Sequence, residues 1–171
     1  MAVIIDRRMH RGIMNIRILL ILVFTHLSAG ALGFAAGIYA LPILIAPPPP
    51  SQVDVEAVAL GARYTAQFKR DLKDSDALHW GEGKVSVGEK YVTFMGNLAP
   101  GPDYKLYFSP QFVETEADFE QFRPSMQLIG DIDTFKNFVI AVPPGVNLTQ
   151  FNTVIVWCET FGQFITSAKF R

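Results

Sequence analysis

The feature that most constrains this chain is a long uncharged stretch near its N-terminus. Residues 18–46 contain no Asp, Glu, Lys or Arg, and only His26 and a few small polar residues interrupt the apolar run. As an α-helix these 29 residues would rise ~43 Å, more than the ~30 Å hydrocarbon core of a bilayer. We therefore expect a transmembrane helix over residues 18–46, through which the chain contacts the membrane.

A cleaved signal peptide is the alternative for this stretch. It needs an apolar core of only about 7–15 residues, followed by a small-residue cleavage site. Residues 28–31, Ser-Ala-Gly-Ala, resemble such a site, but the apolar run continues well past them. We therefore expect an uncleaved anchor, and each candidate start, at Met1, Met9 or Met14, preserves it.

The charges flanking the stretch predict its orientation. Four arginines precede it: Arg7, Arg8, Arg11 and Arg17. After residue 50, eleven Lys or Arg face fifteen Asp or Glu, a net charge of −4. The positive-inside rule places the basic tail, residues 1–17, in the cytoplasm and the remaining domain on the periplasmic or outer face. The whole chain has a net charge of −1, so nucleic acid is not an expected partner.

Two smaller features lie inside the stretch. Gly33 and Gly37 form a G-x-x-x-G pair that would allow an oligomer by close helix packing, although glycine is common in membrane helices generally. His26 is either a proton-relay group or ligand, or a neutral histidine hydrogen-bonded along its own helix. Four prolines at 47–50 then stop the helix, and residues 47–59 are expected to form a stiff spacer that includes about 12 Å of polyproline II.

The rest of the chain, residues 60–171, is mostly β by pattern. Short β-branched or aromatic runs alternate with Gly, Pro, Asp and Asn at residues 63–69, 84–87, 90–96, 104–109, 127–132, 137–142, 153–158 and 163–170. Residues 116–122 are expected to be a helix, capped by Thr115 and stopped by Pro124. Residues 53–62 fit either a helix or a lead-in strand. The predicted fold is mainly β, an antiparallel β-sandwich of about eight strands with one short helix; a barrel is the alternative.

The strand at 153–158 contains the only cysteine of the chain, Cys158. Side chains alternate along a strand, and here both faces are apolar, so the strand is expected to be buried between layers. One interpretation makes Cys158 a redox thiol, a haem or metal ligand, or a partner in an intermolecular disulfide. The other makes it a small hydrophobic core residue, since burial in apolar surroundings lowers thiol reactivity.

No complete catalytic set or metal site is visible, so an enzyme acting alone is not expected. The chain lacks G-x-S-x-G, H-E-x-x-H, P-loop and C-x-x-C motifs. His79 is the one histidine outside the anchor and the tail, so a histidine-dependent device would have to use it, with Cys158 as a partner. The simpler interpretation is a turn histidine beside Trp80.

Three segments resemble the DM13 domain, a family related to the DOMON-type β-sandwiches. They are Gly-Pro-Asp with the extended run at 101–109, residues 129–131 with 137–143, and residues 154–161, which contain W-C-x-x-F and are followed by Phe164 and Ala168. The resemblance covers roughly residues 60–171. It implies a redox or electron-transfer role for Cys158, haem as a cofactor and a separate redox partner protein.

Two functions are therefore weighed. In the first, a membrane-tethered extracytoplasmic module works in electron transfer through Cys158, and Trp157, Phe161 and Phe164 wall a cofactor site to which His79 could contribute. In the second, the sandwich is a non-catalytic module of the cell envelope that binds a protein or glycan, and Cys158 only packs in the core.

Overall fold

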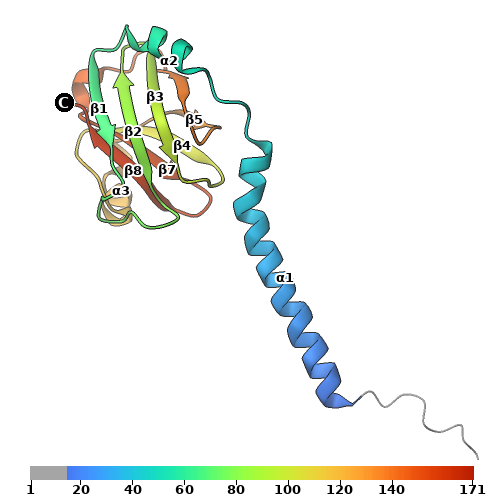
Figure 1. The fold of residues 1–171 in the computed structure, drawn as a ribbon. Helices are drawn as coiled ribbons and strands as arrows, with labels where there is room; N and C mark the ends of the chain where they lie inside the picture. Colours follow the sequence, from blue (N-terminus) through green and yellow to red (C-terminus); the bar gives the residue numbers. More distant parts are fainter. Residues whose placement is uncertain (1–14) are drawn as a thin grey trace, which may run out of the picture. The chain divides into compact units, whose positions relative to one another are not determined.

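The computed structural model describes residues 15–171 (Figure 1). These residues divide into two compact units between Gly37 and Ile38. Helix α1 (Ile16–Ile45) has 30 residues, with a mean hydropathy of 2.1 in its most apolar part. By length and composition, it could cross a membrane. This confirms a helix over the predicted stretch. The three candidate start methionines and most of the predicted basic tail lie outside the described residues.

The polar and small residues of α1 have local explanations. His26 Nδ1 lies 2.7 Å from the carbonyl oxygen of Leu22, one turn earlier, which agrees with a histidine bonded along its own helix. A Cβ at Gly33 or Gly37 would meet nothing within 4 Å, so contacts within the described chain do not require glycine there. An oligomer formed through these glycines stays a prediction.

A second helix, α2 (Gln52–Ala59), resolves the ambiguity at residues 53–62 in favour of a helix. The side chain of Ser51 caps it, because its Oγ accepts a hydrogen bond from the Asp54 N–H at 3.2 Å. Val55 is fully buried, and α2 lies against strand β3 (Tyr91–Leu98). The second half of the predicted spacer is therefore packed onto the folded domain.

Two four-stranded antiparallel sheets form the domain, which confirms the predicted eight-stranded sandwich (Figure 1). The first sheet has the order β1-β2-β3-β6, with β1 (Tyr64–Phe68), β2 (Gly81–Val87), β3 and β6 (Phe138–Ala141). The second has the order β5-β4-β7-β8, with β5 (Gln127–Ile132), β4 (Tyr104–Ser109), β7 (Thr153–Cys158) and β8 (Gln163–Lys169). The remaining elements are α3 (Glu116–Phe122) and two short 3-10 turns, η1 (Arg123–Ser125) and η2 (Leu148–Gln150).

The bounds of α3, β4, β5 and β7 match the sequence prediction, whereas β2 begins three residues earlier than expected. Gly81 and Gly83 look like turn residues in the sequence. In the structure Gly83, at φ +142°, faces Gly96 across the strand pair. A Cβ on Gly96 would lie 2.1 Å from the backbone oxygen of Glu82, so glycine here permits close strand contact instead of a turn.

The central strands of the second sheet, β4 and β7, are largely buried on both faces. The inner face of this sheet packs between the sheets in a large apolar cluster that includes Leu106, Val156 and Cys158. Its outer face holds a smaller cluster under α3, the outer cluster: Tyr107, Val113, Phe119, Ile155, Trp157 and Phe164. Every residue of β7 is buried, as the apolar pattern of residues 153–158 predicted.

Candidate functional site

Strand pairing decides which side chains surround Cys158. β4 and β7 are antiparallel, with Tyr104 opposite Cys158 and Lys105 opposite Trp157. Side chains alternate along both strands, so Tyr104 and Cys158 face the inner cluster while Trp157 faces the outer cluster. The backbone of the sheet thus separates two residues that are adjacent in the sequence.

The thiol of Cys158 is enclosed and has an acceptor. The residue is 3% exposed, and its Sγ–H donates to the carbonyl oxygen of Pro102 at 3.0 Å. Burial raises the pKa of the Cys158 thiol above its ordinary value. The group is therefore a protonated thiol at neutral pH, and not the thiolate that attacks disulfides or binds metals.

The loop at residues 99–103 covers this thiol. The Tyr104 hydroxyl donates to the Ala99 carbonyl at 2.9 Å, and the Glu159 N–H donates to the Asp103 carbonyl at 3.1 Å. Asp103 has φ +57°, a left-handed conformation that Asp tolerates better than most residues. Its carboxylate also accepts a hydrogen bond from the Thr160 hydroxyl at 3.3 Å. The Gly-Pro-Asp segment and the W-C-x-x-F segment, far apart in sequence, therefore meet at Cys158.

Two of the three predicted wall residues, Trp157 and Phe164, belong to the opposite face of the sheet from the thiol, whereas the backbone N–H of Phe161 acts on the thiol and partly offsets the rise in its pKa that burial causes. Trp157 is 1% exposed and stacks on Phe119 of α3, with ring centroids 3.8 Å apart and planes 6° apart. Its indole Nε1 has no hydrogen-bond partner among the described residues. Phe164 belongs to the same outer cluster, and Phe161 is 51% exposed in the turn between β7 and β8.

His79 has a separate environment. Its Nδ1 lies 3.0 Å from Asp76 Oδ2 in its own loop, and this hydrogen bond lowers the pKa of the Asp76 carboxyl. The imidazole lines an open cavity of about 530 Å³ together with Glu116 and Gln163. Cys158 is not among the residues that line this cavity, so His79 and Cys158 do not share it.

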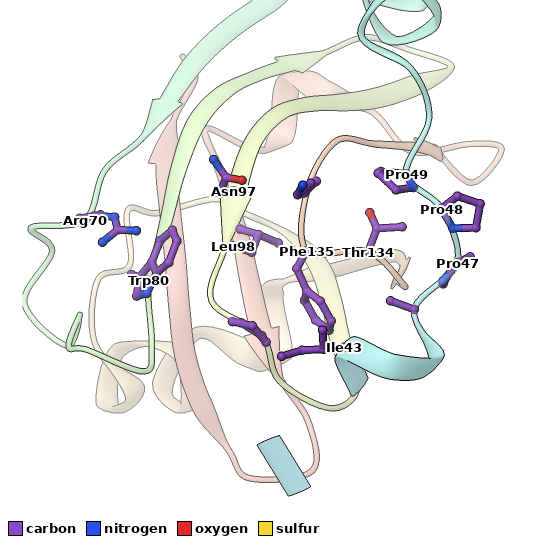
Figure 2. Close-up of a pocket in the computed structure, with 13 residues that line it drawn as sticks. Ile43, Pro47, Pro48, Pro49, Arg70, Trp80, Asn97, Leu98, Thr134 and Phe135 are labelled. Atoms are coloured by element: carbon purple, nitrogen blue, oxygen red, sulfur yellow. The ribbon is translucent and has the colours of Figure 1, made fainter. Parts of the chain in front are cut away.

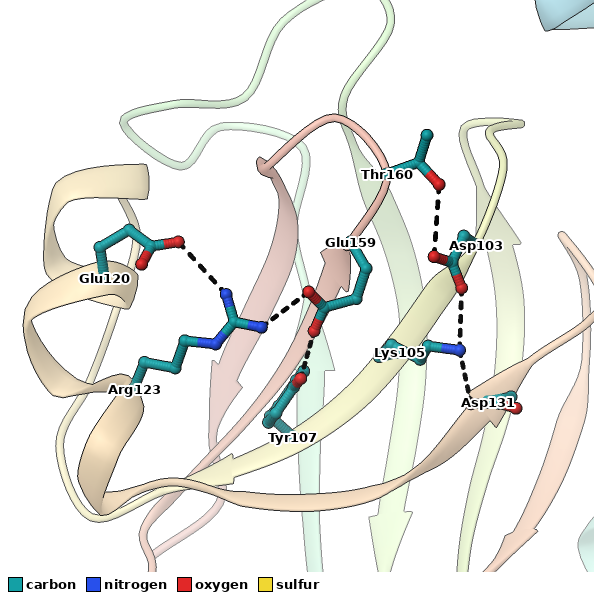
Figure 3. Close-up of polar contacts among 8 residues, drawn as sticks. All are labelled: Asp103, Lys105, Tyr107, Glu120, Arg123, Asp131, Glu159 and Thr160. Atoms are coloured by element: carbon teal, nitrogen blue, oxygen red, sulfur yellow. Dashed lines mark hydrogen bonds and ion pairs between the residues drawn. The ribbon is translucent and has the colours of Figure 1, made fainter.

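Two polar groups at the edge of the outer cluster are formed by contacts that the sequence did not predict (Figure 3). The Tyr107 hydroxyl donates to Glu159 Oε1, and Arg123 Nη2 donates to Glu159 Oε2 at 2.7 Å. Arg123 also reaches Glu120, at 3.4 Å. The pKa of Tyr107 is raised to about 12. Burial is the largest cause, followed by the hydrogen bond to Glu159 and by the negative charge of Glu159.

The second polar group is centred on Lys105. Its Nζ lies 2.8 Å from both Asp103 Oδ1 and Asp131 Oδ1 (Figure 3). The hydrogen bond from Lys105 lowers the pKa of the Asp103 carboxyl. This ion pair also holds the loop that covers Cys158, since Asp103 belongs to that loop. The sequence offers one local signal for it, the i and i+2 spacing of Asp103 and Lys105.

A largely apolar cavity of about 480 Å³ lies beside residues 47–49, with Leu98 and Phe135 in its lining (Figure 2). At one side the Arg70 guanidinium lies 3.3 Å from the ring centroid of Trp80. None of the five site residues predicted from the sequence lines this cavity. It therefore adds no support to the predicted cofactor site.

The haem implied by the resemblance does not fit around Cys158. An axial ligand must direct a sulfur lone pair into a flat cavity. Here the residue packs in the inner cluster, and its thiol donates to Pro102. The two aromatic residues proposed to enclose the haem, Trp157 and Phe164, belong to the opposite face of the sheet.

Comparison with known proteins agrees with the resemblance seen in the sequence. The family model described as "Electron transfer DM13" matches residues 67–170, which is more than half of the chain. Searches of curated proteins and of solved structures gave no match. The chain therefore belongs to the electron transfer DM13 family.

Proposed function

We propose that this protein is a membrane-tethered electron-transfer module in which Cys158 is the redox-active group. Family membership supports the electron-transfer role, and α1 supports the tether. The basic residues before α1 and the acidic domain after it favour a cytoplasmic N-terminus and an extracytoplasmic domain, in the periplasm or on the outer face. A redox partner would then be a separate protein in that compartment.

The meeting of the two motif segments at the thiol is the observation on which this proposal depends. Pro102, the acceptor of the thiol proton, is only partly buried, and the next residue, Asp103, is exposed. The sole thiol therefore lies one residue beneath the surface, under a loop held by Lys105 and Thr160. Opening of that loop would expose the thiol without unfolding the sandwich.

The test measures how the thiol becomes reactive. The full-length protein in detergent is treated with an alkylating reagent at increasing urea, and labelling of Cys158 is followed by mass spectrometry. If the loop opens locally, labelling proceeds at a rate that depends little on urea, because little surface is exposed. The variant Cys158→Ser gives the blank.

Labelling that tracks global unfolding would contradict the proposal. A second readout is the mass of Cys158 after a mild peroxide treatment, where a sulfenic acid is expected. The visible spectrum with and without added haem is a third readout, and no new band is expected because the thiol packs in the inner cluster and donates to Pro102.

A specific observation favours a second candidate, a cell-envelope module that binds a protein or glycan while Cys158 only packs. The 3% exposure of the thiol and its raised pKa are those of a core residue. Under this alternative Cys158→Ser keeps the fold and the cellular role, and the peroxide treatment leaves the thiol unmodified.

A further inference from the structure

The buried side chains around β4 and β7 that can lose one electron differ in where their proton can go. Oxidation of a phenol, an indole or a thiol by one electron makes its proton strongly acidic, so an adjacent base decides which group reacts. Cys158 donates to the carbonyl of Pro102, and Tyr104 donates to the carbonyl of Ala99. Trp157 has no partner at Nε1. A backbone carbonyl does not take a proton near neutral pH.

Tyr107 is the exception among these four groups. Its hydroxyl donates to Glu159 Oε1, and a carboxylate can accept the proton outright. The second oxygen of Glu159 is held by Arg123 Nη2 at 2.7 Å, so the carboxylate has a fixed orientation (Figure 3). A general base is effective when it is within hydrogen-bond reach of the proton that it removes.

Packing holds the ring of Tyr107 in place, as Arg123 holds the carboxylate of Glu159. Tyr107 is 7% exposed, and its ring meets the ring of Phe119 edge-on, with centroids 5.3 Å apart. Burial raises the pKa of Tyr107 to about 12, so the resting group is a neutral phenol. Loss of an electron from the buried Tyr107 phenol therefore does not require solvent to enter the site, provided that the phenol proton is transferred at the same time.

We propose that Tyr107 and Glu159 form a proton-coupled one-electron redox site. The Tyr107 O–H bond breaks, the electron passes to a one-electron oxidant, the oxidised metal centre of a partner protein, and the proton passes to Glu159 Oε1. The products are a neutral tyrosyl radical, a neutral carboxylic acid and a metal centre reduced by one electron. This inference rests on the electron-transfer part of the proposed function and does not require that Cys158 reacts.

The test uses the full-length protein in detergent and a ruthenium polypyridyl photosensitiser with a sacrificial acceptor as the one-electron oxidant. Electron paramagnetic resonance of samples carrying ring-deuterated tyrosine identifies the radical. A neutral tyrosyl signal is expected in the wild type and in the matched control Tyr91→Phe, which removes a 45% exposed tyrosine. Loss of the signal is expected in Tyr107→Phe.

Glu159→Gln tests the proton acceptor separately, because the amide keeps a hydrogen-bond acceptor but is not a base. The rate of radical formation should fall on the order of 100-fold, the low end for loss of a positioned proton acceptor. Circular dichroism and thermal unfolding show whether each variant remains folded. Slower oxidation of the wild type in D₂O is a readout that needs no variant.

An unchanged signal in folded Tyr107→Phe, or an unchanged rate in folded Glu159→Gln, would overturn the proposal, as would the same rate in H₂O and D₂O. Repeating the measurement in Cys158→Ser separates the two proposals. A radical retained there supports the Tyr107 site even when the thiol proves inert. A thiol reactive by local opening, with no Tyr107 radical, leaves the proposed function standing and removes this inference.

Discussion

The buried hydrogen-bond donors on the two faces of the second sheet have different kinds of acceptor. On the inner face, the buried side chains of Cys158 and Tyr104 donate hydrogen bonds to backbone carbonyls. No ion pair among the described residues contributes to that cluster. On the outer face, Tyr107 ends on the carboxylate of Glu159, which Arg123 neutralises. A charge formed on the inner face would therefore have no charged partner, whereas a charge formed on the outer face would lie beside Glu159 and Arg123. This difference matters for electron transfer, because a change in redox state is a change in charge.

The largest expected effect comes from removing the cover of the outer face. Phe119→Ala deletes the ring that stacks on Trp157 and contacts Tyr107 edge-on, so it leaves a cavity between α3 and the sheet. We expect a loss of about 3–5 kcal/mol in the free energy of unfolding, measured by urea titration with circular dichroism. Phe112→Ala, at a residue 40% exposed, is the control. Equal and small losses in both variants would mean that the outer cluster is not a core.

The next effect separates the two faces by pH. The pKa of Tyr107 rises from 10.0 to about 12 on folding, so its neutral form is favoured in the native state. The stabilisation is fully present below pH 10 and is lost as the pH rises through about 12, by up to about 2–3 kcal/mol. Burial, followed by the charge of Cys158, also raises the pKa of Tyr104, so each tyrosine contributes.

Urea titrations across this pH range on Tyr107→Phe and Tyr104→Phe measure the two contributions. Each variant should lose part of the alkaline destabilisation, and Glu159→Gln should reduce only the part that belongs to Tyr107. If the free energy of unfolding falls with pH in both phenylalanine variants as steeply as in the wild type, this assignment is wrong.

A smaller effect is expected at the thiol. Cys158→Ser keeps a donor for the Pro102 carbonyl but places a more polar group in the inner cluster, so we expect a loss of about 1–2 kcal/mol. Thermal and urea unfolding measure it, with Cys158→Ala as the variant that removes the donor. A gain in stability on substitution by serine would show that the thiol is not packed as described.

The smallest effect is expected at Lys105. Asp131→Asn removes one of its two carboxylate partners and leaves Asp103, and Asp131 is 64% exposed at the side chain. Because exposed ion pairs contribute little, we expect less than about 1 kcal/mol, decreasing further with added salt. A larger loss, insensitive to salt, would indicate that the covering loop depends on this pair.

Much of the fold could be predicted from local pattern. Alternation and turn residues located all eight strands, and the Thr115 cap with Pro124 located α3 at its observed bounds. The predicted start of β2 is three residues too late, because a glycine needed for close strand contact looks the same in sequence as a glycine in a turn.

The site was harder to predict, because it depends on pairing between distant segments. Grouping Trp157 with Cys158 followed their adjacency in the motif, although alternation along a strand puts neighbours on opposite faces. The bonds of Glu159 to Tyr107 and Arg123 span 52 and 36 residues. They depend on the register of β4 with β7 and on where α3 ends, which no local pattern contains.

The stacking of Trp157 on Phe119 also gives the protein an optical probe of its own. The chain has two tryptophans, and Trp80 is partly exposed under the guanidinium of Arg70, whereas Trp157 is enclosed. A soluble quencher therefore reaches one emitter and spares the other. The quenched and protected parts of the fluorescence then report separately on the loop before β2 and on the layer beneath α3.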